Sequence, residues 1–384
     1  MPDIFTEVTR RPWGSRVGGS IGGAFLGVLL ALGGMVLLFW NEGRTIHMKS
    51  ALDEARRKFV VIPSETVQAA NEGKLVYLTG NADTTESLND PLFGVSAKAL
   101  KMERNVQTFQ WEEESESHTD KKLGGSEEKT TTYTYAKKWT ASLIDSSKFK
   151  QSTDHYNPPA RVQPDWKATT HTAHIGDFHM PEDFIEELKA DDALNFSQND
   201  LSKVSPEFRA SAHIGGAEFY LGNDPGKPEI GDQRFIYKVL RPATISLLAM
   251  QSANSFRPYT AKSGVRLKLI HAGNASADSL LDEAEHDNES NSSFLRLAGF
   301  ALLFFGFWSF SGPLNTLADI VPFVGGLLRV GTGLLALLGA LIVGCVTIAV
   351  ATFAYHPVFS GVLIAAALVS LYITHRSQRK AADR

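Results

Sequence analysis

Residues 17–40 read VGGSIGGAFLGVLLALGGMVLLFW, and this stretch decides what kind of protein the chain is. It carries no ionisable side chain along its whole length. A helix needs about 20 apolar residues to cross the ~30 Å hydrocarbon core of a bilayer. Three later stretches, 294–310, 330–354 and 358–373, are almost as free of charge. The sequence therefore predicts four transmembrane helices.

The short flanks of these stretches predict their orientation. Arginines are frequent in the N-terminal tail 1–16, and Lys and Arg are frequent in the C-terminal tail 374–384. The turn between the last two stretches has neither. Short loops rich in Lys and Arg stay in the cytoplasm. We therefore expect both tails to be cytoplasmic and residues 41–293 to be extracytoplasmic or lumenal.

Residues 41–293 form the water-soluble part of the chain. They hold 29 Lys and Arg against 38 Asp and Glu, a net charge of −9. The block is long enough for a hydrophobic core of its own, and its negative charge repels nucleic acid. The single cysteine, Cys345, lies in an apolar stretch, which rules out an intrachain disulfide framework and a cysteine-based zinc site.

Strand and helix patterns alternate irregularly inside this block. Residues 105–111 and 130–139 alternate in polarity and predict a long hairpin with aromatic cross-strand pairs, a charged tip and a turn at Gly124-Gly125. Further strands are expected at 74–80, 168–175, 218–221, 234–239, 244–250 and 265–270, and helices at 46–59, 181–189 and 276–289. Strands and helices without a βαβ rhythm favour a strand-rich α+β domain.

Small residues recur at helical spacing in two of the apolar stretches. The first has Gly19, Gly23 and Gly27, and the third has Ala336, Ala340 and Gly344. Such faces let helices approach closely, within one chain or between copies, although glycine is also common in membrane helices for no such reason. The linker 311–329 has helical spacing between two prolines, which fits either a short interfacial helix or a plain loop.

The candidates for chemistry are weak. His171, His174 and His179 are the best metal candidates, but residues 171 and 174 of a strand point to opposite faces. No nucleophile elbow, dinucleotide-binding glycine motif or P-loop stands in the required strand-to-helix context. No charge lies in the middle of any apolar stretch, which gives ion transport little support. We therefore predict no catalytic residue, no metal site and no cofactor.

Several separated blocks resemble one known family. The sequences that carry the resemblance are Asn41-Glu42-Gly43-Arg44, Asn71-Glu72-Gly73-Lys74, Asp90-Pro91-Leu92-Phe93-Gly94, Gln110-Trp111-Glu112, Tyr133-x-Tyr135, Ile175-Gly176-Asp177-Phe178, Gly231-Asp232-Gln233-Arg234 and Lys262-Ser263-Gly264. Together they resemble the transmembrane protein 43 (LUMA) family. The resemblance implies four spans, a large domain outside the cytoplasm and self-association, and it brings no catalytic residue.

These expectations define one main hypothesis and two alternatives. The chain is expected to be a non-enzymatic, multi-pass scaffold that oligomerises and organises other membrane proteins. Its expected partners are the lipid bilayer, copies of itself and other membrane proteins, but no nucleic acid. The resemblance implies the endoplasmic reticulum or inner nuclear membrane in a eukaryote, and we expect the inner membrane with a periplasmic domain in a bacterium. The alternatives are a channel or transport component, and an extracytoplasmic enzyme with a histidine or carboxylate site.

Overall fold

The computed structural model describes residues 3–160, 165–319 and 322–355. Contacts divide the chain into two compact units. The body unit comprises Met1–Glu7, Asp53–Ser117 and Thr131–Glu283. The helix unit comprises Val8–Leu52, His118–Thr130 and Ala284–Arg384.

Three long helices carry the predicted spans. They are α1 (Trp13–Lys58), α4 (Ala277–Phe310) and α6 (Pro322–Tyr355), and each has a stretch long and apolar enough to cross a membrane. A short helix, α5 (Gly312–Ala318), follows α4, so the linker is helical rather than a plain loop in this part. The fourth predicted span, 358–373, and the tail 374–384 lie outside the described residues.

The first two apolar stretches are parts of longer helices. The helices predicted at 46–59 and 276–289 do not form separate elements, because α1 and α4 run through them without a break. The sequence explains this continuity, since neither proline nor glycine occurs at 44–58 or 277–298. These two residue types are the main helix breakers. Residues 40 and 293 are therefore not helix ends, and as bounds of the membrane spans they stay predictions.

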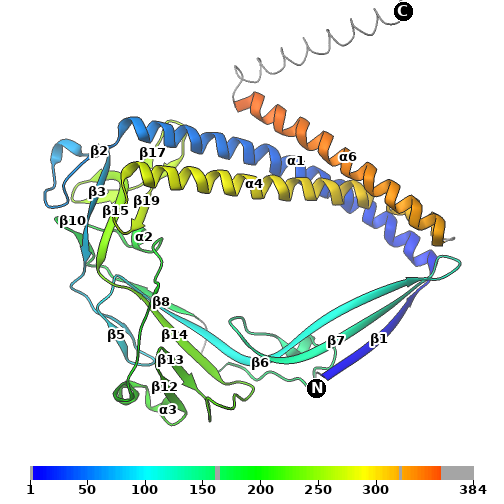
Figure 1. Ribbon diagram of the computed structural model, residues 1–384, viewed down its shortest axis with the longest axis horizontal. Coiled ribbons are helices and arrows are strands. Elements are labelled where there is room, and N and C mark those ends of the chain that lie inside the picture. Colours follow the sequence, from blue (N-terminus) through cyan, green and yellow to red (C-terminus); the bar gives the residue numbers. More distant parts are fainter. Residues whose placement is uncertain (1–2, 161–164, 320–321, 356–384) are drawn as a thin grey trace, which may run out of the picture. The chain divides into compact units, whose positions relative to one another are not determined.

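Within the helix unit, α1 and α4 pack antiparallel at glycines (Figure 1). A Cβ added to Gly27 would lie 2.6 Å from the carbonyl oxygen of Gly306, and one added to Gly34 would lie 2.9 Å from that of Gly299. Only residues without a side chain permit backbones to approach so closely. Leu38 and Leu303 are fully buried beside this contact.

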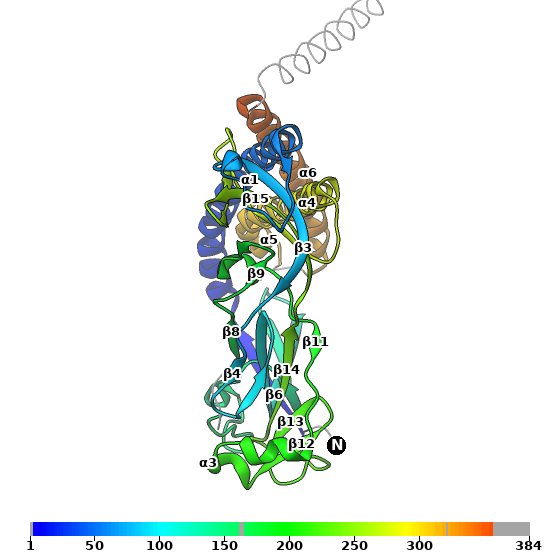
Figure 2. The ribbon, with the colours of Figure 1, turned by 90° about the vertical axis from the view of Figure 1, so that its left-hand side faces the viewer.

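Two large sheets, antiparallel in most of their pairings, organise most of the strands. The larger sheet has the spatial order β1 (Asp3–Arg11), β7 (Glu127–Thr140), β6 (Lys101–Lys121), β14 (Gln233–Leu240), β13 (Glu218–Leu221) and β12 (Ala212–Gly215), with β8 (Trp166–Thr169) and β11 (Asp192–Ala193) off this path. Figure 2 shows β6, β14 and β13 side by side. The phenylalanines Phe93, Phe219 and Phe235 fill the core beneath them.

The second sheet has a core of its own. Its order is β10 (Phe178–His179), β9 (His174–Ile175), β3 (Leu75–Asp83), β15 (Ala243–Ser252) and β16 (Ser255–Arg257), with β2 (Val60–Val61) and β19 (Leu269–Ala272) off this path. The remaining short elements are β4 (Leu88–Asp90), β5 (Val95–Ala97), β17 (Tyr259–Thr260), β18 (Arg266–Leu267), α2 (Glu182–Ile185) and α3 (Pro206–Arg209). The mixture confirms the predicted strand-rich α+β domain.

The predicted hairpin is present and is longer than expected. β6 and β7 are neighbours in the sheet, and the rings of Phe109 and Trp139 lie 5.2 Å apart, so the predicted aromatic pairing is confirmed. The turn contains Gly124 and Gly125, both with positive φ. The charged residues expected in a solvated tip belong instead to the strands, because β6 continues to Lys121.

The N-terminal tail contains a strand. β1 pairs with β7 at the edge of the larger sheet. Within the body unit, Phe5 lies 6.1 Å from the ring of Tyr133, and Asp3 Oδ2 lies 3.1 Å from Nε2 of the buried His155. Residues 1–16, which the sequence predicted only as a tail, therefore form an ordered sheet edge over residues 3–11.

A buried polar triad joins β4, β6 and β14 in the body unit. Asp90 bonds the guanidinium of Arg104 and accepts a hydrogen bond of 2.7 Å from the hydroxyl of Tyr237. All three residues are buried. Burial, and next the charge of Asp90, raise the pKa of Tyr237 well above its ordinary value.

We expect Asp90→Ala to destabilise the body by about 3–5 kcal/mol, because removing one partner of a buried ion pair leaves the other charge uncompensated. The midpoint of thermal unfolding of the full chain in detergent measures this change. Asp90→Asn is the control, since it keeps an acceptor for Tyr237 and should cost less. Equal midpoints for Asp90→Ala and the unchanged protein would contradict this assignment.

Candidate functional site

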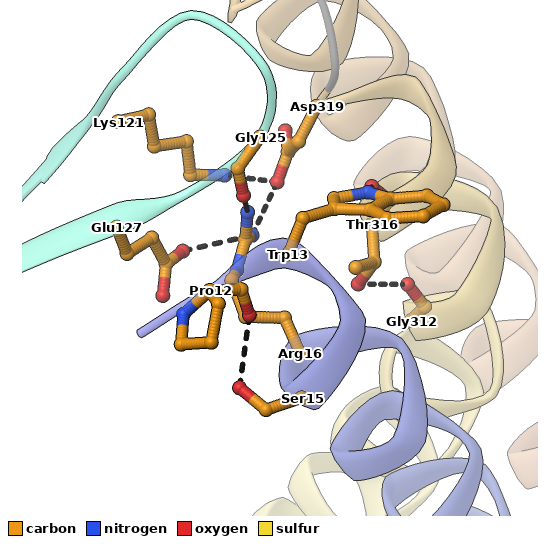
Figure 3. Close-up of polar contacts among 10 residues, drawn as sticks. All are labelled: Pro12, Trp13, Ser15, Arg16, Lys121, Gly125, Glu127, Gly312, Thr316 and Asp319. Carbon is orange, nitrogen blue, oxygen red and sulfur yellow. Dashed lines mark hydrogen bonds and ion pairs between the residues drawn. The ribbon is translucent and has the colours of Figure 1, made fainter. Parts of the chain in front are cut away.

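A cluster of charged groups surrounds Asp319 at the end of α5, in the helix unit (Figure 3). Its carboxylate is almost fully buried. Oδ2 accepts bonds of 2.6 Å from both Arg16 Nη2 and Lys121 Nζ. Arg16 opens α1, and Lys121 ends β6. One acidic group therefore ties the start of the first long helix and the hairpin tip to the linker helix.

Trp13 and Gly125 complete the cluster. The indole nitrogen of Trp13 donates a 3.0 Å hydrogen bond to the carbonyl oxygen of Thr316. A Cβ on Gly125 would overlap the Trp13 ring, and Gly125 has a φ of +78°, so only glycine fits here. Arg16 also bonds the Gly125 carbonyl and Glu127. Arg16 therefore bonds Asp319, Glu127 and the Gly125 carbonyl, and a guanidinium with three partners suits a structural role better than a catalytic one.

This cluster bears on the predicted topology. That topology places residues 1–16 and 41–293 on opposite sides of the bilayer, with 17–40 between them. Arg16 and Lys121 belong to these two regions, yet both bond Asp319. Groups that share one carboxylate lie on one side of a membrane. If this contact forms in the membrane, residues 118–130 lie on the same side as Arg16. The predicted separation of 1–16 from 41–293 would then not hold for residues 118–130.

A second polar site ties α1 to α4 further along the helices. Asn41 is fully buried and donates to both the carbonyl and the hydroxyl oxygen of Ser292, at 3.1 Å each. The buried carboxylate of Glu42 accepts two bonds from Arg296, at 2.6 and 2.8 Å. A two-pronged arginine–carboxylate contact fixes orientation as well as distance. The sequence block Asn41-Glu42 thus sets the register of the two helices.

The next residue of the same block, Gly43, contacts α6. A Cβ on Gly43 would lie 2.5 Å from the ring of Tyr355. Arg44 Nη2 lies 3.5 Å from Oδ1 of Asn41, within its own helix. The three residues Asn41, Glu42 and Gly43 therefore form one junction among the three long helices, and Arg44 bonds Asn41 within it.

The small residues of α6 line its contact with α4. Ala336 and Ala340 are buried, and a Cβ on Gly344 would overlap the ring of Phe300. This face therefore packs inside the chain.

The glycines of α1 fall into two groups. Gly27 packs against α4, whereas Gly19 and Gly23 have nothing within 4 Å of an added Cβ. Gly18 and Gly22 are equally open. These four glycines lie in the first part of the apolar stretch, between the cluster at Asp319 and the α1–α4 contact, and Gly33 is open further along the helix.

The remaining motif residues have structural roles in the body unit. Glu72 accepts a 2.7 Å hydrogen bond from the backbone of Ala253, and Gly73, with a φ of +71°, bonds Gln251. Asn71 is buried beside them. The ring of Trp111 lies edge-on to His155, at 4.7 Å. None of these contacts brings reactive groups together.

The three candidate histidines lie near one another without forming a metal site. His174 and His179 are cross-strand partners in β9 and β10, and His171 bonds Glu182. That contact raises the pKa of His171 above its usual value. Among the residues that the structure describes, no three His, Cys, Asp or Glu side chains are placed to hold a metal ion.

Sequence reasoning missed the cluster around Asp319. Its members are separated by up to 303 residues, and each has an ordinary local interpretation. Arg16 fits the positive flank of a span, and Lys121 fits a charged hairpin. A lone acid in a short linker between two apolar stretches is the one signal that could have pointed to it.

Three long apolar helices joined to a strand-rich α+β domain define an integral membrane protein. A family model described as "Transmembrane protein 43" matches residues 108–357. The chain belongs to the transmembrane protein 43 family. The resemblance inferred from the sequence blocks is thereby confirmed.

Relatives in animals match over most of their length. Transmembrane protein 43 of Mus musculus and that of Homo sapiens are each 30% identical over 376 residues, covering 93% of this chain and 90% of theirs. The homolog from Drosophila melanogaster is 28% identical over 289 residues, covering 74% of this chain and 75% of its own. No solved structure matches the chain.

Proposed function

We propose that the chain is a non-enzymatic membrane scaffold that self-associates through α1 and organises other membrane proteins around its body. The observation that carries this proposal is the division of the α1 glycines. Gly27 and Gly34 contact α4 within the chain, whereas no atom of the described chain lies within 4 Å of a Cβ added at Gly19 or Gly23. Small residues on an open membrane helix allow the close approach that drives helix association in lipid.

The surroundings of these glycines support a second copy of α1 as their partner. Leu26, three residues after Gly23 and therefore on the same face of the helix, is 56% exposed. Large apolar groups flanking a glycine face supply the van der Waals contact that replaces the hydrophobic effect inside a bilayer. A second α1 would present the same glycines and the same apolar groups, as a two-fold interface requires.

Chemical crosslinking in native membranes tests the proposal. Gly19→Leu combined with Gly23→Leu should shift the crosslinked ladder toward monomer, because two leucines would hold a second helix away. Gly333→Leu is the matched control, since Gly333 lies in α6 and is equally open. An unchanged ladder in the double variant would remove α1 as the association surface.

We further propose that residues 8–16, the hairpin tip 118–130 and α5 share one aqueous compartment. The shared carboxylate of Asp319 supports this arrangement. It replaces the prediction that the whole of 41–293 lies opposite the N-terminus.

A further inference from the structure

Two open clefts flank the start of α1 in the helix unit. One, of about 610 Å³, is lined by Arg10, Arg11, Pro12, Lys122, Ser126, Glu127 and Glu128. The other, of about 510 Å³, is lined by Arg11, Ser15, Arg16, Gly19, Glu127 and Thr316. The two clefts share Arg11 and Glu127.

The charge of these clefts is positive. Four cations line them against two carboxylates. Glu127 is held by Arg16 at 2.8 Å, and Glu128 by Arg10 at 2.9 Å. Arg11 makes no ion pair with any residue of the described chain, and Lys122 lies 3.7 Å from Glu128. The clefts therefore keep positive charge that the protein itself does not neutralise, whereas residues 41–293 have a net charge of −9.

The clefts lie next to a surface suited to acyl chains. The apolar stretch of α1 begins at Val17, directly after Arg16. Exposed apolar side chains then recur at helical spacing, at Ile21, Phe25 and Leu29. Trp13 also lies at this end of α1, and tryptophan favours the headgroup level of a bilayer. A ligand that fits both features has an anionic head and apolar tails.

We propose that these clefts bind the phosphate of an anionic phospholipid, with Arg11 and Lys122 as the main cationic contacts. A guanidinium presents paired N–H donors that match phosphate oxygens. The hydroxyl of Ser126 lines the first cleft and adds a donor for a phosphate oxygen, whereas the Ser15 hydroxyl already donates to the carbonyl oxygen of Pro12. A zwitterionic headgroup would bind more weakly, because its own positive group would be repelled by the four cationic side chains of the clefts.

Lipid binding to the full chain tests the proposal. The purified protein is incubated in detergent micelles that contain equal amounts of phosphatidylglycerol and phosphatidylcholine, and the bound lipids are counted by native mass spectrometry. We expect phosphatidylglycerol to be retained in preference. Arg11→Gln and Lys122→Gln should each lower its retention about fivefold, the effect of one cation near an anionic membrane surface. Arg11→Lys should keep most of the binding.

The controls separate a lipid site from a general effect of protein charge. Arg57→Gln removes an equal charge from an exposed position at the far end of α1 and should leave retention unchanged. Equal retention of the two lipids, or equal loss in Arg57→Gln and Arg11→Gln, would overturn the proposal. Displacement of phosphatidylglycerol by millimolar inorganic phosphate would also overturn it, because the site would then recognise soluble phosphate. Thermal unfolding midpoints confirm that the variants remain folded.

Discussion

Replacing Gly27 by leucine should unfold the helix unit, with a loss of at least about 3 kcal/mol in the free energy of unfolding. The added Cβ alone would lie 2.6 Å from the Gly306 carbonyl oxygen and 3.0 Å from the Ser309 Cβ. The oxygen is a backbone atom of α4, so the clash is relieved only by separating the two helices. The midpoint of thermal unfolding in detergent, followed by tryptophan fluorescence, measures the loss.

Gly33→Leu is the matched control for this prediction, because Gly33 lies outside the proposed association surface and outside both clefts. It makes the same substitution in the same helix, but at a position with open space. We expect a change within about 0.5 kcal/mol, as for most exposed substitutions. If Gly27→Leu and Gly33→Leu had the same midpoint of thermal unfolding, the α1–α4 contact would not be the one described.

The second large effect concerns membrane sidedness, where labelling gives an all-or-none result. In a Cys345→Ser background, single cysteines are placed at Thr9 and at Leu123, which is 85% exposed at the hairpin tip. A maleimide that does not cross membranes should react with both from the same side of sealed vesicles. The reason is the cluster at Asp319, which holds both segments.

Reaction of Thr9→Cys and Leu123→Cys from opposite sides would show that the cluster does not form in the membrane. The predicted separation of residues 1–16 from 41–293 would then stand. Reaction from the same side has a consequence for α1. No second apolar span lies between residues 41 and 121 in the described chain. The stretch 17–40 would then not place residues 8–16 and 118–130 on opposite sides of the membrane, as a single transmembrane crossing does.

Much of the architecture was accessible from local sequence patterns. The apolar runs predicted four spans, and three of these lie in long helices of the described chain, because uncharged stretches of that length have few alternatives. Alternation and the pair Gly124-Gly125 predicted the hairpin. The strand at 218–221 was predicted with its observed ends.

Other features depend on partners that are distant in sequence. The strand β1 was missed because nothing near it indicates an edge of a sheet whose next strand begins at Glu127. The family block Asn41-Glu42 was recognised without a physical role. Its role requires Ser292 and Arg296, which belong to another helix. Contacts between residues far apart in the sequence make up most of the candidate site, so local sequence patterns do not reveal it.

The unbroken course of α1 has a mechanical consequence. A helix of 46 residues is a rod of roughly 69 Å at 1.5 Å per residue. Where its apolar part spans a bilayer, a mismatch between the helix and the lipid thickness is relieved by tilting. No proline or glycine between residues 44 and 58 provides a joint to absorb that tilt. A change of tilt in the apolar part would therefore be carried along the same rod to the last turns of α1.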